Sequence, residues 1–166
     1  MTSKIYSAIL AGTAVLAVTL GSTSAQAATA SADARARILS ALTLTNTADL
    51  EFGAIVVSGV ASTVAISPAG LRTCGANLSC SGTFNAASFD ITTGTAGETV
   101  DISHDGPIQL SNGTDTMDVA LALSSATVIL DVNGEGTVTV GGTLDVAGNQ
   151  PEGVYTGIFN VTADYQ

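Results

Sequence analysis

Short runs in which hydrophobic and polar residues alternate follow one another from residue 38 to residue 165. A β-strand sends successive side chains to opposite faces, so this pattern predicts strands that each bury one face. Gly, Asn, Asp and Ser separate the runs, and no sustained apolar pattern of helical period occurs among them. The pattern is typical of a single all-β, Ig-like or jelly-roll-like antiparallel β-sandwich. The predicted strands span residues 38–45, 50–57, 63–67, 88–92, 99–104, 108–110, 117–123, 127–131, 137–140, 143–146 and 154–165, several of them expected to be halves of one bent strand.

The last predicted strand carries the most regular alternation. A strand at a chain end must be paired, or its free edge binds other chains. We expect Phe159, Val161 and Tyr165 to face the core. The function of the protein then depends on which strand pairs with this one. The residues of one parity, predicted to line one face, are Gly153, Tyr155, Gly157, Phe159, Val161, Ala163 and Tyr165.

Residues 1–27 have the pattern of a cleaved secretory signal peptide. Lys4 provides the positive start, residues 5–20 are mostly apolar, and Ala25-Gln26-Ala27 is a small-x-small cleavage site. A transmembrane anchor is the alternative, but Gly and Thr residues interrupt the apolar stretch and no basic cluster follows it. Cleavage after Ala27 predicts a secreted mature chain of 139 residues with no membrane span, enough for one domain.

Residues 28–37 are small, polar and low in complexity, and we interpret them as a flexible arm ahead of a domain at residues 38–166. The domain begins with an alternating segment in which Ile38, Leu42 and Leu44 share a face. Two interpretations of this segment stay open. It is either the first strand of its own domain or a donor strand that completes the sheet of a neighbouring subunit.

The charge and the cysteines limit the range of functions. The mature chain has fourteen acidic residues against three arginines, which disfavours nucleic acid and anionic lipid as partners. Cys74 and Cys80 form an isolated close pair, and an exported chain meets an oxidising compartment, so we expect a disulfide in a loop between strands. The absence of CxxC spacing and the distance of His104 in sequence argue against a redox or metal site.

No catalytic set emerges from the remaining residues, and we expect neither catalysis nor a cofactor. His104 is the only histidine, and the chain has no Gly-x-Ser-x-Gly motif around a nucleophile. Two carboxylate pairs, Asp115 with Asp118 and Asp101 with Asp105, have the chemistry of a glycosidase dyad or a calcium site. The EF-hand pattern is absent, which leaves a weak surface calcium site as an open alternative.

Several stretches together carry a recognisable family pattern. The chain resembles a family of secreted bacterial proteins called domain of unknown function 4402. The resemblance implies a β-sandwich similar to spore-coat-protein-U and archaic chaperone–usher pilin domains, and it implies no catalytic residues. Gly153 and Tyr165 also resemble the glycine and penultimate tyrosine of a pilin's last strand. The matching stretches are Leu42-Thr43-Leu44-Thr45, Leu50-Glu51-Phe52-Gly53, Cys74-Gly75, Leu78-Ser79-Cys80-Ser81-Gly82, Ala87-Ser88-Phe89, Gly113-Thr114-Asp115-Thr116-Met117, Val140-Gly141-Gly142-Thr143-Leu144, Gln150-Pro151-Glu152-Gly153-Val154-Tyr155-Thr156-Gly157 and Val161-Thr162.

These observations predict a non-catalytic, pilin-like structural subunit that assembles on the cell surface by donor-strand addition. Its partners would be copies of itself or related subunits, with a periplasmic chaperone and an outer-membrane usher during export. The alternative is a monomeric secreted binding module, either an adhesin or a carbohydrate-binding sandwich. The chain has no Trp, which disfavours the aromatic platforms that sugar-binding sandwiches generally present.

Overall fold

The computed structural model describes residues 27–166, which contain β-strands and no helix. The predicted all-β antiparallel sandwich is confirmed, whereas the predicted signal peptide lies outside the described residues except for Ala27. Arg37–Gln166 form one compact unit, and residues 27–36 before it are exposed and belong to no strand. The strands are β1 (Thr43–Ala48), β2 (Ala54–Val57), β3 (Ser62–Ile66), β4 (Arg72–Cys74), β5 (Leu78–Ser81), β6 (Ala87–Thr92), β7 (Thr99–His104), β8 (Ile108–Ser111), β9 (Thr116–Leu123), β10 (Thr127–Ile129), β11 (Gly136–Val146) and β12 (Val161–Tyr165).

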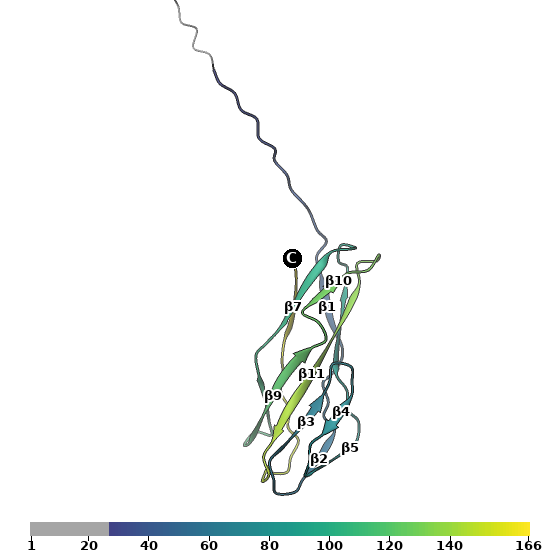
Figure 1. Cartoon of the computed structure of the whole chain (residues 1–166), viewed down its shortest axis with the longest axis vertical. Helices are drawn as coiled ribbons and strands as arrows, with labels where there is room; N and C mark the ends of the chain where they lie inside the picture. Colours follow the sequence, from purple (N-terminus) through teal and green to yellow (C-terminus); the bar gives the residue numbers. More distant parts are fainter. Residues whose placement is uncertain (1–26) are drawn as a thin grey trace, which may run out of the picture. The chain divides into compact units, whose positions relative to one another are not determined.

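Strand β11 organises the largest sheet, in which all pairings are antiparallel. Its first half pairs with β6, its second half pairs with β3, and it also pairs with β9. Strands β1 and β4 extend this sheet beyond β6 and β3, and β8 extends it beyond β9. Figure 1 shows β9, β11, β3 and β4 side by side along the length of the domain.

Two smaller sheets complete the sandwich. One has the order β10-β7-β12, and the other contains β2 and β5 alone. Strand β12 pairs only with β7, and β2 pairs only with β5. The two small sheets are therefore not joined by any backbone ladder, and each ends in a strand with one unpaired edge.

Alternating side chains of these strands build two hydrophobic clusters. The first cluster includes Ile91 and Val140, which are fully buried, and the second includes Val64 and Leu144. Burial alternates along β6 as the sequence pattern predicts, because odd-numbered residues face the core and even-numbered residues do not. Phe159, Val161, Ala163 and Tyr165 pack against the first cluster as half-buried residues.

The predicted segments 137–140 and 143–146 are parts of one strand, since β11 runs through Gly141 and Gly142 without interruption. Glycine is needed at Gly141 because a side chain would not fit there, and not because the chain turns. A Cβ atom on Gly141 would lie 2.2 Å from the carbonyl oxygen of Ile66 in the neighbouring strand β3. The two glycines therefore allow the close approach of β3 and the core to one continuous central strand.

The predicted disulfide is present, but its predicted setting in a loop is wrong. Cys74 is the last residue of β4 and Cys80 lies within β5, with a Cα–Cα distance of 6.0 Å. Between them the chain reverses at Asn77, which has a φ of 68°. Strands β4 and β5 have only three and four residues, too few to establish the alternation from which strands were predicted.

Removal of this disulfide should lower the free energy of unfolding by about 2 kcal/mol. The effect is modest because a cross-link that closes a short loop removes little chain entropy from the unfolded state. The expected result is a modest fall in denaturant midpoint for a Cys74→Ala, Cys80→Ala double variant in urea unfolding. A variant that fails to fold at all would show that the bond organises β4 and β5 rather than merely stapling them.

Asp131 stabilises the turn between β10 and β11. Its Oδ1 atom accepts hydrogen bonds from the backbone N–H of Glu135 at 2.9 Å and of Asn133 at 2.8 Å. These bonds favour the charged carboxylate, so they lower the pKa of Asp131, with the Glu135 bond contributing most.

No helix in residues 27–166 is long and apolar enough to cross a membrane.

Candidate functional site

A groove of about 1310 Å³ lies between the segment around β2 and the segment that leads into β12. Its floor includes Phe52, Val119 and Leu144, which belong to the second core cluster and are at most 7% exposed. The floor is therefore closed, and the empty space lies above the core rather than within it. The residues lining the groove are Asn46, residues 49–57, Phe89, Ile108, Leu110, Met117, Val119, Leu144, Val146 and residues 150–159.

The groove lies between two backbone edges that have no strand partner on the side of the groove. On one side stands β2, whose only strand partner is β5. On the other side stands the segment 150–160, where the backbone hydrogen bonds to other elements join Thr156 to Ser111 and Asn160 to Asp105. Both sides therefore present N–H and C=O groups that have no strand partner across the groove.

Apolar side chains remain in water along this segment. Val154 is 82% exposed and Ile158 is 87% exposed, and on the opposite side Val56 of β2 is 63% exposed. Exposed apolar side chains beside two open strand edges are typical of a surface that another chain covers. The rim is acidic, because Asp49, Glu51 and Glu152 line the groove and no Lys or Arg does.

Glycine keeps the segment 150–160 close to the neighbouring β8. A Cβ atom on Gly157 would lie 2.6 Å from the carbonyl oxygen of Gln109. Gly153 has a φ of 155°, a backbone conformation that residues other than glycine rarely adopt. The glycines predicted to lie on one face of the last strand thus shape the wall of the groove, and the regular strand begins only at Val161. The prediction of a strand over residues 154–165 was therefore too long.

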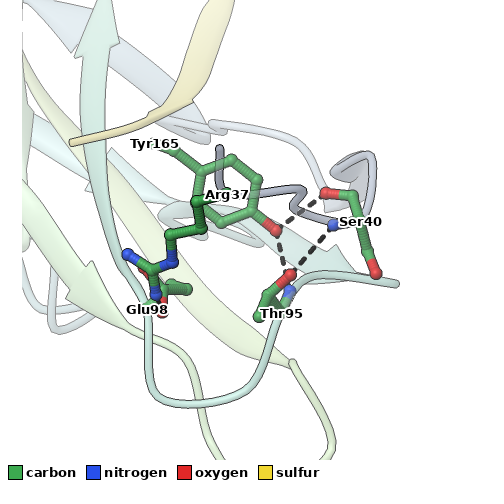
Figure 2. A network of polar contacts seen from close by, with 5 residues as sticks. All are labelled: Arg37, Ser40, Thr95, Glu98 and Tyr165. Atoms are coloured by element: carbon green, nitrogen blue, oxygen red, sulfur yellow. Dashed lines mark hydrogen bonds and ion pairs between the residues drawn. The ribbon is translucent and has the colours of Figure 1, made fainter. Parts of the chain in front are cut away.

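A polar network ties the penultimate residue to the start of the domain, as Figure 2 shows. The Tyr165 hydroxyl donates to the carbonyl of Ser40 at 2.9 Å and accepts from the N–H of Thr95 at 2.7 Å. The Ser40 N–H in turn donates to Thr95 Oγ1 at 2.9 Å, and Arg37 forms an ion pair with Glu98. The network fixes residues 37–40 beside the end of β12.

The segment predicted as a donor strand is held by its own domain. Leu42 and Leu44 are half-buried against the first core cluster, and Thr43–Ala48 pair with β6. Ile38 differs from them, because it is 93% exposed. In the structure this segment therefore leads into the first strand of its own domain, which was one of the two interpretations. The strand begins at Thr43 rather than at residue 38.

One known protein family matches most of this domain. The family described as "Domain of unknown function (DUF4402)" matches residues 42–165. The chain belongs to this family. The match begins next to β1 and ends at Tyr165, so it takes in the groove and the last strand but leaves out the arm. No curated protein and no solved structure shows significant similarity to the chain.

In the DUF4402 domain, His104 and three of the four candidate carboxylates (Asp101, Asp105 and Asp118) make local contacts. His104 Nδ1 contacts the carbonyl of Asp105, and Asp105 Oδ2 accepts from both the backbone and the side chain of Asn160. Asp101 accepts from Gln166 at 2.6 Å and Asp118 accepts from Gln109 at 2.8 Å. Within residues 27–166, no group of three or more His, Cys, Asp or Glu side chains is placed to hold a metal ion.

The groove could not be predicted from the sequence, because its existence depends on which strands pair with one another. Alternation along one strand predicts which face is buried, but it does not reveal that β2 and β12 each lack a partner on one edge. A local signal was available only in part. Val154 and Ile158, two apolar residues on the otherwise polar face of the last predicted strand, line the groove and are exposed.

Proposed function

We propose that the protein is a non-catalytic, pilin-like structural subunit that joins other copies by strand addition. The observation that carries the proposal is the groove between β2 and the segment before β12. An extended segment of another molecule can hydrogen-bond to both open edges while alternate side chains cover the groove floor. One added strand would join the β2–β5 sheet to the β10–β7–β12 sheet and close the sandwich.

Burial of apolar surface supports this proposal energetically. The free domain leaves Val154, Ile158 and Val56 in water above a closed core. Covering apolar surface contributes about 25 cal/mol per Å², and pairing of the backbone edges removes the tendency toward uncontrolled association. An added strand would be held by both effects, so the resulting assembly should resist dissociation.

The remaining features of the proposal concern location and partners. Export to the periplasm and assembly on the cell surface agree with the signal-like N-terminus and with the Cys74–Cys80 disulfide, because such bonds persist in oxidising compartments. During export the open groove would need cover, and a periplasmic chaperone with an outer-membrane usher would supply it. The proposal requires no cofactor.

A monomeric binding module is less well supported by the same groove. Tyr155 is the aromatic residue best placed to contact a ligand, but its hydroxyl donates to the carbonyl of Pro151 and accepts from Gln150, both at 2.9 Å. Phe159 packs edge-on against Phe89 rather than offering a flat face, with ring centroids 6.1 Å apart. Neither ring forms the open platform that carbohydrate recognition needs.

The test of the proposal is the mass of the mature chain, residues 28–166, in light scattering after size exclusion over a range of concentrations. We expect species several times the monomer mass that persist on dilution. Val57→Asp places a charge in the groove wall and should leave mainly monomer, whereas Val132→Asp, at a 90% exposed position outside the groove, should assemble as the parent does. A parent chain that stays monomeric at every concentration would overturn the proposal.

A further inference from the structure

We propose that the Arg35–Ala36 peptide bond is a processing site for an endopeptidase that cleaves after arginine, and that the fold protects every other bond of the mature chain from the same enzyme. The inference is independent of the proposed assembly, since it concerns only which stretches of backbone the fold leaves free. The mature chain contains no lysine and three arginines, Arg35, Arg37 and Arg72. The structure holds the chain around these three positions to very different degrees.

The chain around Arg35 is unpaired and lies in water. Residues 27–38 are all exposed and belong to no strand, and no hydrogen bond within residues 27–166 involves the backbone of residues 27–39. Arg35 forms an ion pair with Asp33 at 3.4 Å, and both side chains are 87% exposed. An exposed pair of this kind contributes little stability, so the guanidinium is available to another carboxylate.

This segment has the chemistry that trypsin-like endopeptidases recognise. Such enzymes hold an arginine side chain in a pocket that contains a carboxylate, which matches the planar guanidinium. An exposed segment outside any strand can become extended against the enzyme without loss of native hydrogen bonds. Hydrolysis breaks the C–N bond between Arg35 and Ala36, with the hydroxyl of water going to the carbonyl carbon of Arg35 and the proton to the nitrogen of Ala36.

Arg37 lies only two residues further on, but the domain holds it. Its guanidinium forms an ion pair with Glu98, whose side chain is only 16% exposed. An enzyme that cuts after Arg37 must also bind the residues that follow, and both backbone groups of Ser40 are occupied by Thr95 and Tyr165 (Figure 2). Cleavage at Arg37 therefore requires this network to open first.

Arg72 is protected more completely, because it lies within the folded sheet. It begins β4, which pairs with β3, and the disulfide-bonded Cys74 ends the same strand. Its guanidinium donates to the carbonyls of Phe52 and Ser81 and lies over the ring of Phe84. A cut after Arg72 therefore needs unfolding of this part of the domain.

Cleavage after Arg35 would detach most of the arm from an otherwise intact domain. Both core clusters, the groove and the network around Tyr165 lie within Arg37–Gln166. The remaining domain carries two arginines that the enzyme does not reach, so the reaction stops after one bond. The chain thus combines a removable N-terminal segment with a domain that persists in the presence of such enzymes.

A matched pair of substitutions in the mature chain tests the site. Trypsin is the probe, and mass spectrometry of the native protein over time identifies each new N-terminus. The parent should give one lasting product that begins at Ala36. Arg35→Gln should slow removal of the arm by about tenfold or more, whereas Arg37→Gln, which removes the same charge two residues away, should leave the rate within about twofold of the parent. Equal slowing by both variants, or a first product that begins at Ile38 or Thr73, would overturn the assignment.

A double variant tests why Arg37 is spared. Glu98→Gln removes the ion pair, and Tyr165→Phe removes the hydroxyl that holds Ser40. Trypsin should then cut after Arg37 as well, so the lasting product should begin at Ile38. A lasting product with the same N-terminus as that of the parent would overturn protection by the network.

A charge control and a folding check complete this test. Exposed Glu135 forms no ion pair within residues 27–166, so the lasting product of Glu135→Gln should still begin at Ala36. Melting temperatures of all variants are measured before digestion, and Glu98→Gln alone replaces the double variant if that variant melts near the digestion temperature. A fragment that begins at Thr73, from any variant that melts as the parent does, would overturn the protection of Arg72.

Discussion

Leu144→Ala should lower the free energy of unfolding by about 2–5 kcal/mol, the cost of removing a large side chain from a well-packed core. Leu144 is 1% exposed and belongs to the cluster below the groove. Its register partners are Val64 in β3 and Val119 in β9, both also nearly inaccessible to solvent. Three strands hold these backbones in place, so the cavity has little freedom to collapse.

The measurement is urea unfolding of the parent and the variant at the same protein concentration, followed by circular dichroism. Val132→Ala is the control, because Val132 is 90% exposed and its truncation should change the free energy of unfolding by no more than about 0.5 kcal/mol. If Leu144→Ala cost no more than the control, the floor of the groove would not be a packed core.

The local alternation of the sequence was sufficient to predict the fold class and the orientation of the last strand. Phe159, Val161 and Tyr165 are half-buried while Asn160, between the first two, is exposed, as their parity predicts. Such predictions succeed because the pleat of a strand is a local property of the backbone. They need no knowledge of the strand's neighbours.

Features that depend on pairing between distant segments were not predictable in this way. The groove exists because β2 and β12, which are far apart in sequence, have no strand between them. The choice between the two interpretations of residues 38–45 depends on a similar long-range effect. Tyr165 binds Ser40 across most of the chain length, and this contact together with the pairing of β1 and β6 holds that segment in its own domain.

The strands of the disulfide region show a third limit. Strand β4 has three residues, Arg-Thr-Cys, and β5 has four, Leu-Ser-Cys-Ser, so neither is long enough for alternation to identify it. They exist because their partners β3 and β2 supply the ladders and because Arg72 bridges them. The Arg72 guanidinium donates to the carbonyls of Phe52 and Ser81 and lies over the ring of Phe84, 4.3 Å from its centroid. Hydrophobic pattern alone does not report such contacts.

The adjacent glycines of β11 provide a prediction in which neighbouring positions should differ sharply. Gly141→Ala should be severe, at or above the upper end of the about 1–3 kcal/mol typical of overpacking. Its new Cβ atom would lie 2.2 Å from the carbonyl oxygen of Ile66 and 2.7 Å from the backbone nitrogen of Pro68. Backbone atoms of a paired strand cannot move aside without loss of the β11–β3 ladder.

Gly142→Ala should be much milder, even though Gly142 is also buried in the centre of β11. The nearest atoms to its new Cβ would be side-chain carbons, Val119 Cγ1 at 3.0 Å and Leu50 Cδ2 at 3.1 Å. Side chains can give way by a few tenths of an ångström, and Leu50 is only half-buried, so it has room to move toward the groove that it lines. We expect a cost near or below about 1 kcal/mol. Thermal unfolding of the two single variants side by side tests the contrast. Equal losses of stability would mean that the register of β11 against β3, which places Gly142 opposite Ile66, is not the one described.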